Sequence, residues 1–446
     1  MSHVLHRKLA TTPPSIVHAE GLWLKDAEGR SYLDAVSGGA AVSSIGHGDP
    51  RVTAAIDAQL EKVAFAHNSF FTNEPAEELA DYLIAKAPQG LSRVLYCSGG
   101  SEAVEAALKL ARQVWIERGR PEKRTVIARR QSYHGGTLGA LSIGGNKPRS
   151  LPYAPMLFPA RFVDPCYAFR NQNADESEEE YGQRAAASLE RAILREGADS
   201  IAAFVCEPVV GATLGCAPAV SGYLKRIREI CDRYDVLLIF DEVMCGAGRT
   251  GYAFACEEDG AVPDLLTMAK GLGGGYQPIG AVVVHDKVVE AIAQGSGVLL
   301  QGFTYMAHPI ACAAALAVQR IIDEDGLLAR VQEKGARLRA RLEASFGQHP
   351  HVGDIRGRGL FLGLELVDDR ARATPFDPRL AVHARLKQIA LDEGLMVYPS
   401  GGTVDGTNGD HVLLAPAFTV GDADIDEIVR RLEISLARTL KEIGRT

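Results

Sequence analysis

The sequence predicts an α/β protein, with a large domain built on a mostly parallel central sheet and a smaller α+β domain formed from both termini. Short apolar segments alternate with helical segments from about residue 75, which is typical of a parallel sheet covered by helices. After about residue 310, helices dominate. We therefore predict a large domain over residues 61–314 and a small domain over residues 1–60 and 315–446.

Length and composition agree with this prediction. A chain of 446 residues is long enough for two domains, and an apolar content of 46% is ordinary for a globular protein. The net charge of −8 argues against nucleic acid as a partner. The sequence contains no apolar run long enough to span a membrane, and its start lacks the apolar core of a signal peptide. We expect a cytoplasmic protein.

The N-terminal region is predicted to contain a hairpin and a helix. Apolar and polar side chains alternate over residues 21–38, around a turn at Glu28 and Gly29. Apolar residues then recur at helical spacing over residues 50–64, which predicts a helix there.

Five short apolar strands are predicted in the large domain, at residues 93–97, 125–128, 201–206, 236–240 and 279–284. Helices are expected over residues 77–86 and after the SGGS segment. Polar groups follow four of the strands, namely residues 98–101, Tyr133 with His134, Glu207, and Asp241. Because ligands collect at the carboxyl ends of strands in open α/β sheets, we expect these groups to meet at one site.

An acidic segment and a mainly helical C-terminal region are predicted in the rest of the chain. Residues 171–181 are acidic and are expected to form a solvated loop that leads into a helix. In the C-terminal region we expect a strand pattern over residues 352–366 and helices over residues 310–323, 329–345, 380–393 and 422–443.

Two residues between positions 235 and 276 have side chains suited to cofactor chemistry. Asp241 follows the apolar run VLLIF, where an unpaired carboxylate is costly to bury. Its partner is either a protonated ring nitrogen or an arginine such as Arg249. Lys270 lies in the mostly apolar segment DLLTMAKG, where a lysine loses its proton more easily and can form a Schiff base. The simpler alternative is a surface lysine.

Two further groups complete the predicted cofactor site. The SGGS segment at 98–101 precedes a helix, where N–H groups and the helix dipole favour a phosphate; the alternative is a tight turn capped by Ser101. Tyr133 either stacks on a flat ring or packs in the core. An anion site, a stacking ring, a carboxylate and a Schiff-base lysine together are what pyridoxal phosphate requires.

Other cofactors are not indicated. The eight cysteines are scattered without a CxxC pair, so free buried thiols are expected rather than disulfides or zinc. The histidines lack metal-binding spacing. The GLGGG segment at 271–275 lacks the GxGxxG spacing of a nicotinamide site.

With these motifs the chain resembles class III (ω-type) pyridoxal-phosphate aminotransferases of fold type I over nearly its whole length. The segments that carry the resemblance are LDAVSGGAAVSSIGHGDPRV (33–52), SGGSEAVEAALKLAR (98–112), YHGGT (133–137), CEPVVG (206–211), IFDEVMCGAGRTG (239–251), DLLTMAKG (264–271) and GFTYMAHPIACAAALA (302–317).

The resemblance implies pyridoxal 5′-phosphate as cofactor and a role for each matching residue. Lys270 would form the Schiff base and carry the proton between substrate and cofactor. Asp241 would keep the ring nitrogen protonated, and Glu207 would order the site. The implied cofactor-binding residues are Gly100, Ser101, Tyr133, His134, Asp241, Val243, Lys270 and, from the neighbouring subunit, Thr304.

The activity implied by the resemblance is transfer of an amino group from an ω-amine or amino acid to a keto acid, with pyruvate expected, through pyridoxamine phosphate. A homodimer or a dimer of dimers is implied, with the sites at the subunit interface. The alternatives are an aminomutase, a decarboxylating relative and a non-catalytic cofactor-binding regulator. The intact pair of Asp241 and Lys270 argues against the regulator.

The chain departs from its relatives in how it would bind a substrate carboxylate. Many of them use a mobile arginine near the C-terminus, but residues 394–418 contain none. The candidates to replace it are Arg149, Arg161, Asn408 and His411. The residues predicted to line the substrate pocket are Ser69, Phe70, Phe71 and Tyr153.

Overall fold

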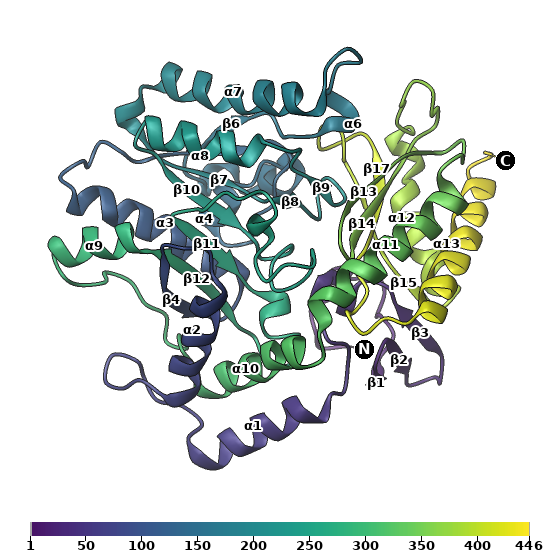
Figure 1. Ribbon diagram of the computed structural model, residues 1–446. Helices are drawn as coiled ribbons and strands as arrows, with labels where there is room; N and C mark the ends of the chain where they lie inside the picture. Colours follow the sequence, from purple (N-terminus) through teal and green to yellow (C-terminus); the bar gives the residue numbers. More distant parts are fainter. Residues whose placement is uncertain (1, 446) are drawn as a thin grey trace.

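A seven-stranded sheet forms the centre of the computed structural model, which describes residues 2–445 (Figure 1). The order across the sheet is β4-β12-β11-β10-β7-β5-β6. The strands are β4 (Leu91–Cys97), β5 (Thr125–Arg129), β6 (Arg161–Val163), β7 (Ile201–Cys206), β10 (Leu237–Asp241), β11 (Leu265–Met268) and β12 (Gly280–His285). Among the described strands of this sheet, β12 runs opposite to the other six, which are parallel to one another. The predicted mostly parallel sheet is confirmed.

Helices cover both faces of this sheet because its strands are apolar on both sides. In β10, Leu238 and Phe240 pack in a cluster with α2, α7, α8 and α10, whereas Leu237 and Ile239 pack in another cluster with α3 and α9. Alternation of side chains along a strand produces this division. The helices are α2 (Glu74–Lys86), α3 (Gly100–Glu117), α7 (Glu178–Glu196), α8 (Tyr223–Arg233), α9 (Asp286–Gln294) and α10 (Pro309–Glu324).

Short elements connect these layers. They are α4 (Leu138–Ser142), α5 (Lys147–Ser150), α6 (Ala168–Asn171), β8 (Val209–Val210) and β9 (Ala217–Pro218). The turns and short helices between β5 and β6 bring α5 to the carboxyl side of the sheet, next to the residues that follow β5.

The N-terminal and C-terminal segments of the chain pack together beside the large sheet, as Figure 1 shows for the purple and the yellow to light-green segments. One small sheet joins β1 (Ile16–Glu20), β2 (Trp23–Asp26), β3 (Ser31–Asp34) and β15 (Leu395–Met396). A second joins β13 (Val352–Arg358), β14 (Phe361–Leu366), β17 (Asp410–Leu414) and β16 (Tyr398–Gly401). Three helices pack with them: α11 (Leu327–Phe346), α12 (Val382–Asp392) and α13 (Asp422–Glu442).

Two details differ from the sequence prediction. The pattern over residues 352–366 is a hairpin rather than one strand, and it turns at Gly359, whose positive φ of 54° suits a glycine. The predicted domain boundaries fall inside α1 (Pro50–Lys62) and α10. The division into two domains remains a prediction. Within residues 2–445, no helix is both long and apolar enough to cross a membrane.

Candidate active site

A cavity of about 710 Å³ opens at the carboxyl edge of the large sheet. The loops that leave β4, β5, β7, β10 and β11 all contribute to its walls. The predicted residues that line it are Gly100, Ser101, Tyr133, His134, Glu207, Asp241, Val243 and Lys270. The structure therefore brings together the polar groups that were expected to meet at this edge.

Asp241 is the last residue of β10 and is almost fully buried. Its Oδ2 lies 2.7 Å from Nδ1 of His134, and its Oδ1 accepts hydrogen bonds from the Val243 N–H at 3.0 Å and the Thr267 hydroxyl at 3.2 Å. The alternative pairing with Arg249 is wrong, because that guanidinium donates to Pro416 and Leu360 main-chain oxygens and to Ser37. The carboxylate is thus held rigidly at the bottom of the cavity.

Lys270 directly follows Ala269 at the end of β11, the strand next to β10. Its side chain is half-buried and lines the cavity. Burial lowers the pKa of the Lys270 amine, and the charges of Asp241 and Glu207 oppose that shift only in part. The backbone φ of 45° is unusual for a residue with a side chain and is typical of functional sites. The surface-lysine alternative is wrong, since this amine faces the cavity.

Glu207 is hydrogen-bonded to the segment that follows β5. The Glu207 carboxylate accepts hydrogen bonds from the N–H groups of Tyr133 at 3.2 Å and Gly211 at 3.1 Å. Burial raises the pKa of Glu207, against the opposing charges of His134 and Arg129. The buried carboxyl therefore fixes the position of the Tyr133 backbone, and the Tyr133 ring lines the cavity.

The start of α3 is open to an anion. Gly99 occupies the N-cap position, and no side chain caps the helix, so its first N–H groups face the cavity without a side-chain acceptor. The Ser101 hydroxyl accepts a hydrogen bond from Gly136 at 3.0 Å rather than capping the helix. A Cβ at Gly100 would lie 2.6 Å from Cγ1 of Val243, so only glycine allows this close approach.

Residues 5–436 match the family model for class III aminotransferases. The chain belongs to the class III aminotransferases. An uncharacterised aminotransferase of Schizosaccharomyces pombe is 46% identical over 96% of this chain and 93% of its own. A taurine–pyruvate aminotransferase of Rhodobacter capsulatus is 37% identical, covering 97% and 94%. The (S)-enantioselective ω-transaminase of Thermomicrobium roseum has a TM-score of 0.91 at 35% identity, covering 98% and 96%.

Class III aminotransferases use pyridoxal 5′-phosphate, and the cavity fits that group. The uncapped start of α3 suits its phosphate, and the half-buried amine of Lys270 suits its aldehyde. Asp241 is an acceptor for a ring N–H, and its second partner, His134, has an Nε2 that is buried without a hydrogen-bond partner in the described chain. The donors and acceptors present are those that an anionic, aromatic aldehyde needs.

Some predicted residues of this aminotransferase lie outside the cavity of their own chain. Thr304 is exposed, and so are Ser69, Phe70, Phe71 and Tyr153. The four predicted substrate residues therefore do not line the cavity within one chain. Phe70 and Phe71 are 78% and 68% exposed, which is unusual for phenylalanine.

The sequence prediction missed several residues that line the cavity. They are Arg7, Gly38, Gly39, Ala40, Val42, Gln277, Lys387 and Tyr398. The adjacent glycines Gly38 and Gly39 were a signal in the sequence, because such pairs often adopt a positive φ, and here φ is 72° and 92°. Lys387 and Tyr398 belong to the C-terminal part, and no local pattern marks a residue that reaches the site from a distant segment.

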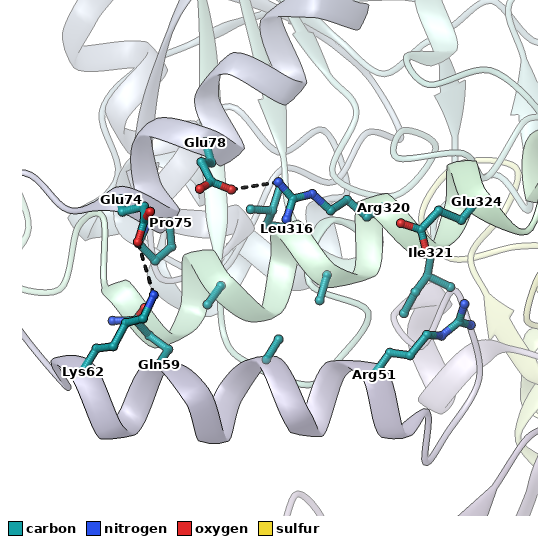
Figure 2. Close-up of a pocket in the computed structure, with 13 residues that line it drawn as sticks. Arg51, Gln59, Lys62, Glu74, Pro75, Glu78, Leu316, Arg320, Ile321 and Glu324 are labelled. Atoms are coloured by element: carbon teal, nitrogen blue, oxygen red, sulfur yellow. Dashed lines mark hydrogen bonds and ion pairs between the residues drawn. The ribbon is translucent and has the colours of Figure 1, made fainter.

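A second cavity, of about 470 Å³, lies between α1, α2 and α10 (Figure 2). Two pairs of its charged side chains interact: Lys62 with Glu74 at 3.3 Å and Arg320 with Glu78 at 2.8 Å. Because these four charges are already paired, this cavity is a weaker candidate for a ligand than the one that contains Asp241 and Lys270.

Proposed function

We propose that this aminotransferase binds pyridoxal 5′-phosphate in the large cavity and moves an amino group from an ω-amine or amino acid to pyruvate. One observation carries the proposal: Asp241 ends β10, Lys270 follows the adjacent parallel strand β11 by two residues, and both line the same cavity. The open start of α3 lies in the wall of that cavity. The proposal is supported by an anion site, a carboxylate that suits a ring nitrogen and an amine in the walls of one cavity.

When bound, pyridoxal phosphate supplies an aldehyde for the amino group and a ring that accepts the electron pair left on the substrate carbon. The Nζ of Lys270, with its lowered pKa, would take the proton from that carbon and give it to the carbon of the cofactor's aldehyde group, and the reverse transfer would supply a proton to the acceptor's carbon. Asp241, held by Val243 and Thr267, keeps a proton on the ring nitrogen. Tyr133 and Val243 bound the space that the flat ring would occupy.

The choice of pyruvate as acceptor is supported by the taurine–pyruvate aminotransferase of Rhodobacter capsulatus, which covers nearly the whole chain. The choice of ω-amines is supported by the ω-transaminase of Thermomicrobium roseum, whose fold superposes with a TM-score of 0.91. Both are proteins that this chain resembles, and its own substrates have to be determined by experiment.

Spectroscopy of the loaded enzyme tests the proposed substrates. Mixed with a panel of amines and amino acids, without keto acid, the yellow protein is expected to lose its colour with true donors. Pyruvate is then expected to restore the colour at least about tenfold faster than 2-oxoglutarate. The measurement is stopped-flow absorbance, with product analysis by mass spectrometry.

Other outcomes would point to other reactions. Isomerisation of one amino acid without any keto acid would identify an aminomutase, and release of carbon dioxide would identify a decarboxylating enzyme. Failure of every donor to bleach the colour would exclude amino-group transfer. Faster recovery with 2-oxoglutarate would overturn the choice of pyruvate alone.

We also propose that the aminotransferase acts as a homodimer in which Thr304 of a second copy completes the phosphate site. An exposed apolar patch supports this proposal; it consists of Phe65, Phe70, Phe71 and Tyr305, whose rings are linked through contacts with the His67 ring. The rings of Phe65 and Tyr305 lie 5.8 Å apart, so segments distant in sequence form one surface. Exposed apolar patches of this kind mark protein interfaces.

Disruption of the patch tests the homodimer. The double substitution Phe70→Asp with Phe71→Asp is expected to convert a dimer to a monomer in sedimentation velocity and to weaken cofactor retention by about tenfold or more, because the two phosphate sites lose their partner residues. Exposed Leu194 on α7 provides a control, since Leu194→Asp should leave the dimer intact. A wild-type protein that sediments as a monomer would contradict the proposal.

A further inference from the structure

A keto acid presents a carboxylate, which needs a cationic or donor-rich partner when it enters a partly closed cavity. Residues 394–418 contain no arginine, so the partner has to come from another segment. The described structure allows each sequence candidate to be judged by where it lies and what it already binds.

Three of the candidates are already engaged. Arg161 lies on the edge strand β6 and pairs with Glu196 at 2.7 Å. The amide of Asn408 donates to the neighbouring Asp405 at 2.7 Å on an exposed loop. His411 is fully buried, and burial lowers its pKa to about 3, so that its ring carries no charge near neutral pH.

Arg149 differs from these residues in its position, its lack of a carboxylate partner and its charge. It lines the cavity that contains Lys270 and Asp241. Its guanidinium lies over the Tyr133 ring, 4.5 Å from the centroid. Within the described chain it forms no ion pair with a carboxylate, although it is half-buried. A planar cation fixed by stacking, with its donors unused, is suited to binding a carboxylate through two hydrogen bonds.

The other charges in the cavity support this choice. Glu207 and Asp241 are both buried, and hydrogen bonds from neighbouring groups already hold them. Arg7 and Lys387 also line the cavity, but both side chains are exposed. Neither of them stacks on an aromatic ring of the site. Arg149 is therefore the cation whose orientation is held by a residue of the cavity, namely Tyr133.

We propose that Arg149 binds the carboxylate of the keto acid acceptor and of amino acid donors, in place of an arginine in residues 394–418. The proposal rests on the proposed aminotransferase function, because it assigns a substrate group of that reaction. Arg149 would then determine specificity for keto acids over aldehydes, while Tyr133 positions its guanidinium.

Kinetics with matched acceptors provide the first test. Arg149→Gln is expected to lower kcat/KM for pyruvate by about 10- to 100-fold, mostly through KM, and to leave kcat/KM for butanal within about threefold. Arg149→Lys should lose less than Arg149→Gln because it keeps the charge. Arg130→Gln serves as the matched control, since Arg130 is exposed and pairs with Asp164. Equal losses with both acceptors, or no loss with pyruvate, would overturn the proposal.

Binding without turnover provides the second test and separates this proposal from the proposed function. Calorimetry of the holoenzyme with 3-phenylpropanoate and its uncharged analogue 3-phenylpropan-1-ol should show preference for the carboxylate in the wild type. Arg149→Gln should remove that preference, and Arg130→Gln should keep it. If no amine bleached the enzyme, transamination would fail, yet this comparison would still decide whether Arg149 binds a carboxylate; an unchanged preference would refute it.

Discussion

Replacing Lys270 by alanine is expected to abolish amino-group transfer, with a loss in kcat of about 10⁴-fold or more. The reason is the environment of its amine, which faces the cavity and whose pKa is lowered by burial, so that it gives up its proton more readily than an ordinary lysine. The second lysine that lines the cavity, Lys387, is exposed and lies on α12. Steady-state transfer from an accepted amine to pyruvate measures the effect.

The controls for this substitution are the melting temperature of the variant and two further substitutions, Lys387→Ala and Lys270→Arg. Alanine keeps the Cβ at a position with a φ of 45°, so the backbone strain is the same in both proteins and the melting temperature should be nearly unchanged. Lys387→Ala should retain most of the activity. Lys270→Arg should be nearly as inactive as Lys270→Ala, because a guanidinium does not release its proton near neutral pH. More than about a tenth of the wild-type rate in Lys270→Ala would exclude Lys270 as the essential base.

The alternation of apolar strands and helices was sufficient to predict the large sheet, because strands buried on both faces are nearly continuous apolar runs. The direction of β12 was not predictable, since a buried strand has the same pattern in either direction. Strand β11 was not predicted, because it is only four residues long, Leu265–Met268, and such a short apolar run does not distinguish a strand from a helix or a loop.

The site was predictable where it lies at strand ends. Glu207 and Asp241 directly follow predicted apolar strands, and the topology of a parallel sheet brings such positions together. Contacts between distant segments were not predictable. The pairing of His134 with Asp241, the stacking of Arg149 on Tyr133 and the approach of Tyr398 depend on loops whose paths no periodicity describes.

Replacing Asp241 by asparagine is expected to lower kcat by about 10²- to 10⁴-fold while the protein stays folded. Asparagine keeps an oxygen that accepts hydrogen bonds from Val243 and Thr267, but it loses the charge that would hold a proton on the ring nitrogen. Turnover and thermal unfolding are measured on the same preparations. Thr267→Val removes only one hydrogen bond to the carboxylate, and it should cost less than about tenfold in kcat.

Asp241→Ala distinguishes a structural from a chemical role for this carboxylate. Alanine also removes the partner of the buried His134 ring, so it should destabilise the protein by about 1–3 kcal/mol more than asparagine does. If Asp241 served only to hold His134, turnover would follow stability, and Asp241→Asn would remain active. If it also keeps the ring nitrogen protonated, both variants should lose turnover to a similar extent although they differ in stability. Because the carboxylate is anchored from three sides, we expect the second pattern, in which activity depends on the charge and stability on the hydrogen bonds.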